Sequence, residues 1–255
     1  MRGALLLLTA LALAACAQTA RELPASRSAP AASRSPDAWA EEIARFEATD
    51  RISPPRPGGV LFVGSSSIRL WPALEADFRG VDVVQRGFGG SELSDVVTYA
   101  GRIVLPYRPR LIVLYAGDND LAAGKSPEAV FADYQTFVTL VQRALPGTRI
   151  AFIAIKPSPA RWALVDQIRA ANALVRGYAA ADPRLLYVDV FSPMLGPDGM
   201  PREELFVADR LHLNARGYAL WRELLLPIVG HSARSLALVL TDGRRHRGVR
   251  TTAAA

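Results

Sequence analysis

Cysteine, histidine and long apolar runs are scarce in this chain. Its 255 residues include one cysteine and three histidines, which excludes an internal disulfide framework and a zinc site built from cysteines. The longest apolar run, residues 4–15, is too short to cross a hydrocarbon core of about 30 Å as a helix. Hydrophobic residues nevertheless make up 50% of the chain and charged residues 21%. This composition excludes a mainly disordered chain, a collagen and a coiled coil.

The net charge of +6 lies at the two ends of the chain. Residues 231–255 contain five arginines and one acid, and residues 1–30 contain three arginines and one acid. The resulting charges of +4 and +2 account for the whole total, so residues 31–230 are neutral. A basic stripe on a folded face is therefore not supported, and we expect no nucleic-acid partner.

The first 15 residues have the pattern of a secretory signal peptide, with Arg2 followed by an apolar run. That run ends in Leu13-Ala14-Ala15-Cys16, which resembles the bacterial lipoprotein signal. The resemblance implies cleavage before Cys16 and lipidation of its thiol, and hence an exported protein anchored in the cell envelope, in the periplasm or on the outer surface. The alternative is an ordinary secreted protein in which Cys16 is incidental. Residues 16–34 are rich in Ala, Ser, Pro and Arg and are expected to form a flexible tether.

Residues 35–230 alternate between short apolar segments and helical patterns. The apolar segments predict strands at 60–63, 81–84, 111–115, 149–155 and 185–188. Helices are predicted after the start signal at 35–37, near 91–102, 127–145 and 162–181, and at 215–229. Since uninterrupted apolar strands are buried on both faces, we expect one three-layer α/β/α domain, a flavodoxin-like, doubly wound parallel sheet of about five strands. Residues 231–255 are predicted to be a basic, mostly disordered tail, whose arginines could dock on anionic lipid.

Polar residues follow the predicted strands, at the sheet edge where open α/β folds bind ligands. Three serines follow the first strand, a glycine turn follows the second, and an Asp-Asn-Asp segment follows the third. Asp209 and His212 precede the last helix, and His212 is the one histidine outside the tail. A hydroxyl, an imidazole, a carboxylate and an amide at one edge are the components of acyl-transfer catalysis.

Each of these signals has a structural alternative. Asp209 could cap a turn and His212 could be a packed core residue. The glycine turn could be a plain turn or a phosphate-binding loop, and Asn119 could be a turn residue. Four of the oxygen-bearing residues could hold a hard cation, although no calcium-loop spacing occurs: Asp118, Asn119, Asp120 and Asp209.

Residues 59–228 resemble the SGNH hydrolases, the GDSL-type esterases and lipases. The match consists of four blocks in order: Gly64-Ser65-Ser66, Gly87, Asn119 within Gly117-Asp118-Asn119-Asp120, and Asp209-x-x-His212. The resemblance implies that Ser66 is the nucleophile, that His212 is the base and that Asp209 orients His212. It also implies an oxyanion hole made by the backbone N–H groups of Ser66 and Gly87 and the side-chain amide of Asn119.

Two positions depart from the family pattern. Ser65 stands where the family usually has Asp, and Gln85 stands where it usually has Asn. A separate segment after the fourth strand carries Lys156, Arg161 and Trp162. A cation beside an indole could receive a sugar or an anionic acyl group, so this segment is a possible substrate loop; the alternative is a surface loop. The tryptophans at 71, 162 and 221 are expected in the core.

Together these observations favour a serine esterase or acylhydrolase of the cell envelope that cleaves small or short-acyl esters. No metal or organic cofactor is expected. The expected partners are a small-molecule ester, which could be an acylated glycan or lipid, and the membrane, which the protein would contact through the lipid on Cys16. An acyltransferase or thioesterase could use the same triad. A non-catalytic glycan-binding module on the same fold is the alternative outside the enzymes.

Overall fold

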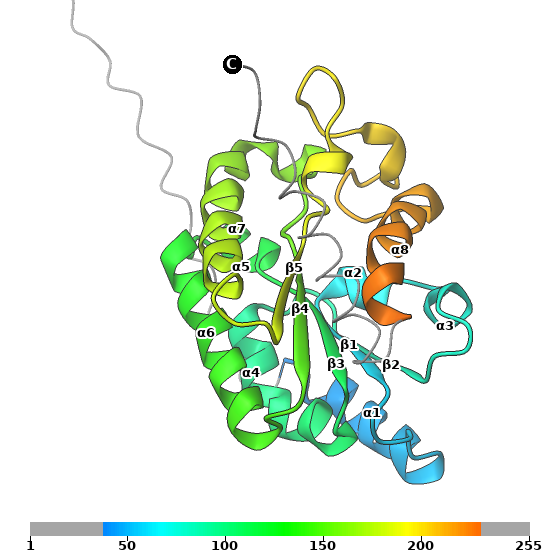
Figure 1. The fold of residues 1–255 in the computed structure, drawn as a ribbon. Helices are drawn as coiled ribbons and strands as arrows, with labels where there is room; N and C mark the ends of the chain where they lie inside the picture. The colour runs from blue at the N-terminus through cyan, green and yellow to red at the C-terminus, as the bar shows by residue number, and fades with distance from the viewer. Residues whose placement is uncertain (1–37, 231–255) are drawn as a thin grey trace, which may run out of the picture. The chain divides into compact units, whose positions relative to one another are not determined.

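The computed structural model describes residues 38–230, in which strands and helices alternate (Figure 1). The expectations for the signal peptide, Cys16, the tether, the helix-start signal at 35–37 and the tail fall outside the described residues. The strands of the described region are β1 (Val60–Gly64), β2 (Val83–Gly87), β3 (Leu111–Tyr115), β4 (Arg149–Ile153) and β5 (Leu185–Val188). Its α-helices are α1 (Ala40–Ile52), α2 (Ser66–Arg69), α3 (Leu74–Asp77), α4 (Leu93–Ile103), α5 (Asp118–Ala122), α6 (Pro127–Ala144), α7 (Val165–Ala179) and α8 (Ala215–Val229). Short 3-10 helices lie at Leu105–Tyr107, Pro159–Leu164, Ser192–Met194 and Glu203–Leu205.

The sheet has the strand order β2-β1-β3-β4-β5, and every neighbouring pair is parallel. The chain leaves β1 toward one edge of the sheet and then returns to place β3 on the other side of β1. The order therefore reverses between β1 and β3, and a doubly wound sheet binds its ligands at the carboxyl ends of the strands at such a point. The predicted flavodoxin-like α/β fold is confirmed.

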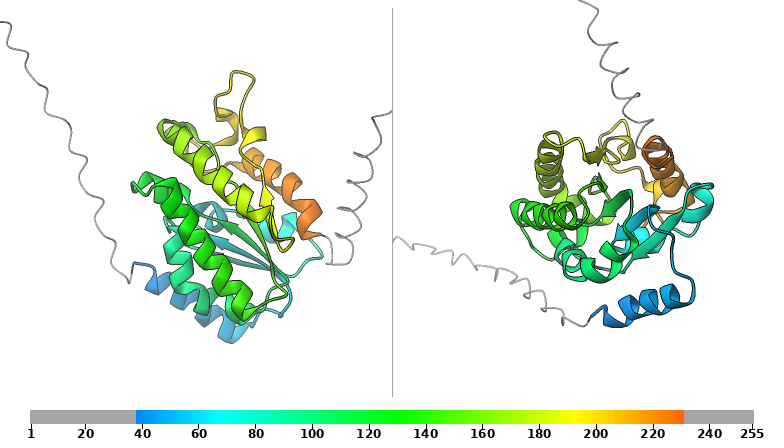
Figure 2. Two further views of the ribbon diagram at one scale, coloured as in Figure 1. Left: turned by 60° about the vertical axis from the view of Figure 1, so that its left-hand side comes forward. Right: turned by 60° about the horizontal axis from the view of Figure 1, so that its bottom comes forward.

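Each face of the sheet has its own hydrophobic cluster. Leu61 and Val63 of β1 belong to one cluster, and Val60 and Phe62 belong to the other, because successive side chains of a strand point to opposite faces. Helices α1, α4, α6 and α7 cover the first face, and α3 and α8 cover the second (Figures 1 and 2). Burial on both faces explains why the strands are apolar without interruption.

Four sequence expectations need correction. The fourth strand, expected at 149–155, ends at Ile153. The second strand is shifted toward the C-terminus and runs to Gly87, which pairs with Gly64 of β1. The helix expected from 162 begins as a 3-10 segment, and α7 proper starts at Val165. Trp71 and Trp221 are buried as predicted, but Trp162 is half-exposed. Between residues 38 and 230 the structure contains no helix with the length and apolarity needed to cross a bilayer.

Candidate active site

The turn after β1 brings Ser66 to the sheet edge. Gly64 has a φ of 135°, and a Cβ at this position would lie 1.9 Å from the carbonyl oxygen of Tyr115. Only glycine fits here, since side chains disfavour this φ and no space exists for one. The backbone N–H of Ser65 donates to the same Tyr115 carbonyl, at 2.9 Å. The chain then turns away from the sheet, and Ser66 becomes the first residue of α2.

The three consecutive serines have different environments. Ser65 is buried, and its hydroxyl makes no hydrogen bond within the described part of the chain. Ser67 is also buried, with its Oγ 3.3 Å from the Nζ of Lys156. Ser66 is half-buried, and its Oγ lies 2.9 Å from the Nε2 of His212. Of the three hydroxyls, the one at position 66 therefore contacts the imidazole.

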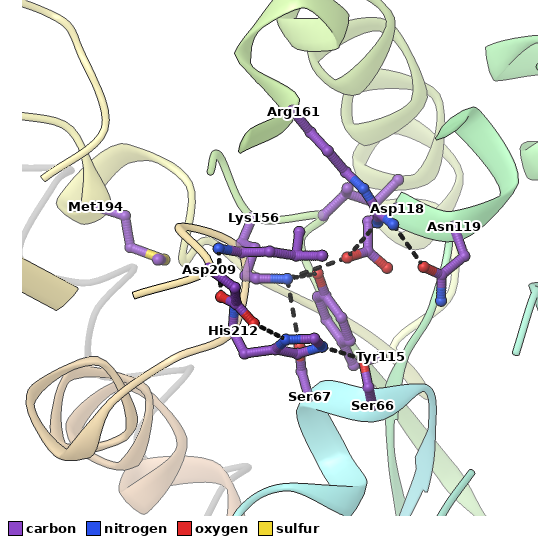
Figure 3. A network of polar contacts seen from close by, with 12 residues as sticks. Ser66, Ser67, Tyr115, Asp118, Asn119, Lys156, Arg161, Met194, Asp209 and His212 are labelled. Atoms are coloured by element: carbon purple, nitrogen blue, oxygen red, sulfur yellow. Dashed lines mark hydrogen bonds and ion pairs between the residues drawn. The ribbon is translucent and has the colours of Figure 1, made fainter. Parts of the chain in front are cut away.

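His212 lies between Ser66 and Asp209 (Figure 3). Its Nδ1 is 2.6 Å from Oδ2 of Asp209. An ionised carboxylate can only accept, so Nδ1 carries the proton and, in the neutral ring, Nε2 is free to accept the Ser66 hydroxyl. The structure thus joins residues that are 146 positions apart into one hydrogen-bonded chain.

Asp209 is held by its own turn. Its Oδ1 accepts hydrogen bonds from the backbone N–H groups of Leu211 and His212, each at 2.9 Å. Arg210 takes a left-handed conformation, with φ of 59°, which allows the turn to close around the carboxylate. Partial burial raises the pKa of Asp209, but the hydrogen bonds from His212 and from the turn outweigh it and lower this pKa to about 2. The carboxylate therefore stays ionised and holds the ring.

Asn214 fixes the loop of Asp209 and His212 to helix α8. Its side-chain oxygen accepts from the backbone N–H groups of Arg216 and Gly217 at the start of the helix. Its amide nitrogen donates to two carbonyl groups of the preceding chain, at 2.9 Å each. The irregular segment before α8 thus has a defined position, because one side chain bonds to both the helix and the loop.

Gly87 ends β2 beside the Ser66 turn. A Cβ at Gly87 would lie 2.2 Å from the backbone nitrogen of Arg69, so the close approach of the two segments requires glycine. Gln85, which departs from the family pattern, donates from Nε2 to the carbonyls of Ile68 and Trp71, at 2.6 and 3.2 Å. The longer amide therefore anchors β2 to the segment that follows Ser66.

Asn119 lies in α5, which follows β3, the neighbour of β1. Its Nδ2 donates to the carbonyl oxygen of Ser91 at 2.9 Å, and its Oδ1 accepts from Arg161 at 2.9 Å. The three candidate oxyanion donors at 66, 87 and 119 thus lie at the carboxyl ends of three adjacent strands. The Asn119 amide is thus held at both its nitrogen and its oxygen by residues from other segments.

A buried polar cluster lies next to this edge. Lys156 is 1% exposed, and its Nζ donates to Oδ2 of Asp118 at 3.0 Å and to the hydroxyl of Tyr115 at 2.9 Å. Arg161 binds the same Oδ2 at 3.0 Å. Burial raises the pKa of Asp118, but the two cations outweigh it, so the pKa falls below its usual value. The carboxylate is therefore the centre of an ion-pair network.

The expectation for the substrate loop needs correction at Lys156. A fully buried ammonium that is bound to Asp118 cannot receive a substrate. Trp162 is half-exposed and lies under the guanidinium of Arg169, 5.9 Å from the ring centre. Arg161 remains partly accessible. Because Lys156 directly follows an apolar segment, the sequence could have indicated a buried ammonium with an acidic partner. It could not have identified Asp118 as that partner.

The alternative of a hard-cation site finds no support in the geometry. Asp118 is bound by Lys156 and Arg161. Asp120 is bound by Lys125, at 3.1 Å. Within residues 38–230 no group of three or more His, Cys, Asp or Glu side chains is arranged to hold a metal ion.

Comparison with known proteins adds family information to this geometry. Residues 59–220 match the model of the GDSL-like Lipase/Acylhydrolase family. No curated protein matches the chain. Several solved structures have a similar fold. One is a Streptococcus pneumonia protein provisionally named a platelet activating factor, which is 22% identical in sequence and has a TM-score of 0.67. The match covers 74% of this chain and 92% of that protein's chain. A GDSL-like lipase from Bacteroides thetaiotaomicron has 20% identity, coverage of 74% and 97%, and a TM-score of 0.64. A mutant acetyl-xylooligosaccharide esterase from Geobacillus stearmophilus has 15% identity, coverage of 69% and 96%, and a TM-score of 0.53.

Proposed function

Since the chain belongs to the GDSL-like Lipase/Acylhydrolase family, we propose that it is a serine esterase whose nucleophile is Ser66, whose base is His212 and whose orienting carboxylate is Asp209. The observation that carries this proposal is the hydrogen-bonded chain from Ser66 Oγ through His212 to Asp209, at 2.9 and 2.6 Å. The 2.9 Å distance allows proton transfer from the nucleophile to its base, and the 2.6 Å distance allows Asp209 to orient the ring.

The reaction follows from the positions of these atoms. As Ser66 Oγ attacks the ester carbonyl, its proton passes to Nε2 of His212, and Asp209 stabilises the imidazolium. Negative charge develops on the carbonyl oxygen, where the N–H groups of Ser66 and Gly87 and the Asn119 amide donate to it. His212 then protonates the leaving alcohol. His212 then takes a proton from a water molecule as the water oxygen attacks the acyl-Ser66 carbonyl, and it returns that proton to Ser66 Oγ when the bond between Oγ and the acyl group breaks.

The substrate class is proposed as small or short-acyl esters, with an acylated glycan as one candidate. The acetyl-xylooligosaccharide esterase among the structural neighbours acts on an ester of this kind, although its 15% identity supports only a common fold. The neutral net charge of residues 31–230 argues against a bulk-lipid lipase. A series of p-nitrophenyl esters of increasing acyl length measures this preference directly.

Labelling with a fluorophosphonate tests the nucleophile. The wild-type protein should be labelled and should hydrolyse p-nitrophenyl acetate, and Ser66→Ala should lose both properties. Ser65→Ala is the matched control, since its buried hydroxyl has no hydrogen bond in the described region. An active Ser66→Ala variant would refute the assignment. If the wild type is labelled and does not hydrolyse esters in water, but transfers the acyl group to an added alcohol or thiol, it is an acyltransferase. Cleavage of thioesters would indicate a thioesterase.

We also propose that the protein is a lipoprotein of the cell envelope. The support is the sequence alone: a signal-like run that ends at Cys16, the one cysteine of the chain. Labelling cells with a clickable fatty acid should mark the wild type and leave Cys16→Ser unmarked. An unmarked wild type would remove the anchor from the proposal and would leave the esterase assignment untouched.

A further inference from the structure

Arg161 contacts the side-chain amide of Asn119 at its oxygen, so that the amide nitrogen points away from the guanidinium. The guanidinium donates to Oδ1 of Asn119 at 2.9 Å, and Nδ2 of Asn119 donates to the carbonyl of Ser91 at 2.9 Å. A guanidinium can only donate and a carbonyl can only accept, so these two partners permit one orientation of the amide. In Figure 3 the amide nitrogen points away from Arg161, toward the side on which Ser66 lies.

Arg161 is itself held in place by the buried cluster. Its guanidinium lies 3.0 Å from Oδ2 of Asp118, and Lys156 binds the same oxygen at 3.0 Å. The Arg161 side chain is 19% exposed, and that of Asp118 is 5% exposed. A planar guanidinium that binds a carboxylate and an amide at once has little freedom to rotate. Its charge also acts in surroundings with little water, where electrostatic effects are larger than at the surface.

We propose that Arg161 is a positioning residue that orients the Asn119 amide and strengthens its Nδ2–H as a donor to the oxyanion. This inference rests on the proposed esterase function, in which Asn119 is an oxyanion donor. Two effects contribute. The bond to Oδ1 prevents rotation of the amide, and it draws electron density from the amide so that Nδ2–H donates more strongly. The hydrogen bond from Nδ2–H matters most once negative charge has developed on the carbonyl oxygen, so loss of Arg161 should affect kcat more than KM.

The competing explanation is that Arg161 binds part of the substrate. A small neutral ester separates the two, since p-nitrophenyl acetate offers no anionic group to the guanidinium. Arg161→Met removes the charge and all donors. We expect it to lower kcat for p-nitrophenyl acetate by roughly 10- to 100-fold, with KM within about twofold of wild type. Arg161→Lys retains a charge near Asp118 but loses the forked geometry, so it should recover part of this loss.

A double-mutant cycle with Asn119 gives the decisive measurement. Asn119→Ala alone should lower kcat by about 10²–10³-fold, as expected for one oxyanion donor. If Arg161 acts through Asn119, adding Arg161→Met to Asn119→Ala should lower kcat by less than about threefold more. If the two effects multiply, or if Arg161→Met raises KM and leaves kcat unchanged, the positioning role is wrong.

Controls separate this inference from folding and from the esterase assignment. Arg176→Met removes an exposed guanidinium, 60% accessible and paired with Asp189, and should leave kcat within about twofold of wild type. Thermal unfolding shows whether each variant folds. If Arg161→Met does not fold, the same cycle is run with Arg161→Lys, and multiplying effects overturn the proposal there too. Activity in Ser66→Ala would refute the esterase itself, whereas an inactive Ser66→Ala together with a multiplying cycle would refute only the role of Arg161.

Discussion

Asp209 and Asp118 are carboxylates near the Ser66 turn, but they are stabilised in different ways. The side chain of Asp209 is 47% exposed and is held by N–H groups of its own turn and by His212. Asp118 is buried and is held by Lys156 and Arg161, which follow a different strand. Loss of Asp209 is therefore expected to affect the chemistry, whereas loss of Asp118 would leave the buried ammonium of Lys156 without a counter-charge.

The largest expected effect comes from replacing Asp209, the more exposed of the two carboxylates. Asp209→Asn should lower kcat/KM by about 10⁴-fold, since an amide no longer fixes the Nδ1–H tautomer of His212. That loss corresponds to roughly 5 kcal/mol in the barrier. The melting temperature should change little, because the side chain is half in water and its turn can be kept by the amide oxygen. Asp166→Asn, at an exposed position on α7, is the control for loss of a surface charge. A large fall in melting temperature for Asp209→Asn would show that Asp209, like Asp118, is needed for folding.

Loss of the buried carboxylate of Asp118 is expected to affect folding. Asp118→Ala should lower the free energy of unfolding by about 3–5 kcal/mol, because the buried ammonium of Lys156 loses its counter-charge. The double variant Asp118→Ala/Lys156→Met should regain part of that loss, because it also removes the buried ammonium. Urea denaturation measures both variants. Equal stabilities for the single and double variants would show that the ion pair is not what makes Asp118 necessary.

Asp120 is a second buried carboxyl on α5, and its environment differs from that of Asp118. Burial raises its pKa to about 6 despite the ammonium of Lys125 and the backbone N–H of Leu93. A carboxyl with a raised pKa in the folded state contributes stability below about pH 4, and this contribution is lost as the pH rises through 6. Relative to Asp120→Asn, the wild type should therefore lose on the order of 1–3 kcal/mol between pH 4 and 7. Urea denaturation of both proteins across this range measures the difference, and parallel curves would contradict the raised pKa.

The smallest expected effect concerns residues 87–90, here called the Gly87 loop, which Trp39 at the start of α1 contacts. The Nε1 of Trp39 donates to the carbonyl of Gly89 at 2.9 Å, and its ring meets Phe88 edge-on at 5.9 Å. Trp39→Phe keeps an aromatic ring but removes the donor. We expect a loss of about 0.5–1.5 kcal/mol in stability and a modest fall in kcat with KM unchanged. A wild-type kcat would show that the Gly87 loop keeps its position without α1.

Much of the fold could be predicted from the sequence because its signals are local. The last helix was expected at 215–229 and is found at Ala215–Val229, where the Asn214 cap and the apolar spacing agree. The second strand was misplaced because its extent is set by pairing with β1, which joins Gly64 to Gly87. Register between strands depends on contacts across the sheet, and no segment carries that information alone.

The candidate site was predictable in its residue types and less so in its contacts. The topology rule placed a serine cluster, an amide and an Asp/His pair at one edge. Which serine faces His212 depended on the turn after Gly64, and the burial of Lys156 depended on a carboxylate after another strand. Long side chains with several rotatable bonds reach partners that are fixed only once the backbone has folded.

The alternation of strands and helices, the layered architecture and the family of this protein could be predicted from the sequence, because they depend on apolar periodicity and on short motifs in a fixed order. The contact of Arg161 with the Asn119 amide and the burial of Lys156 arise only in the folded chain. The physical reason is that a hydrogen bond requires two atoms about 3 Å apart in a defined direction. Packing of the whole sheet and its helices sets that distance, and no local pattern records it.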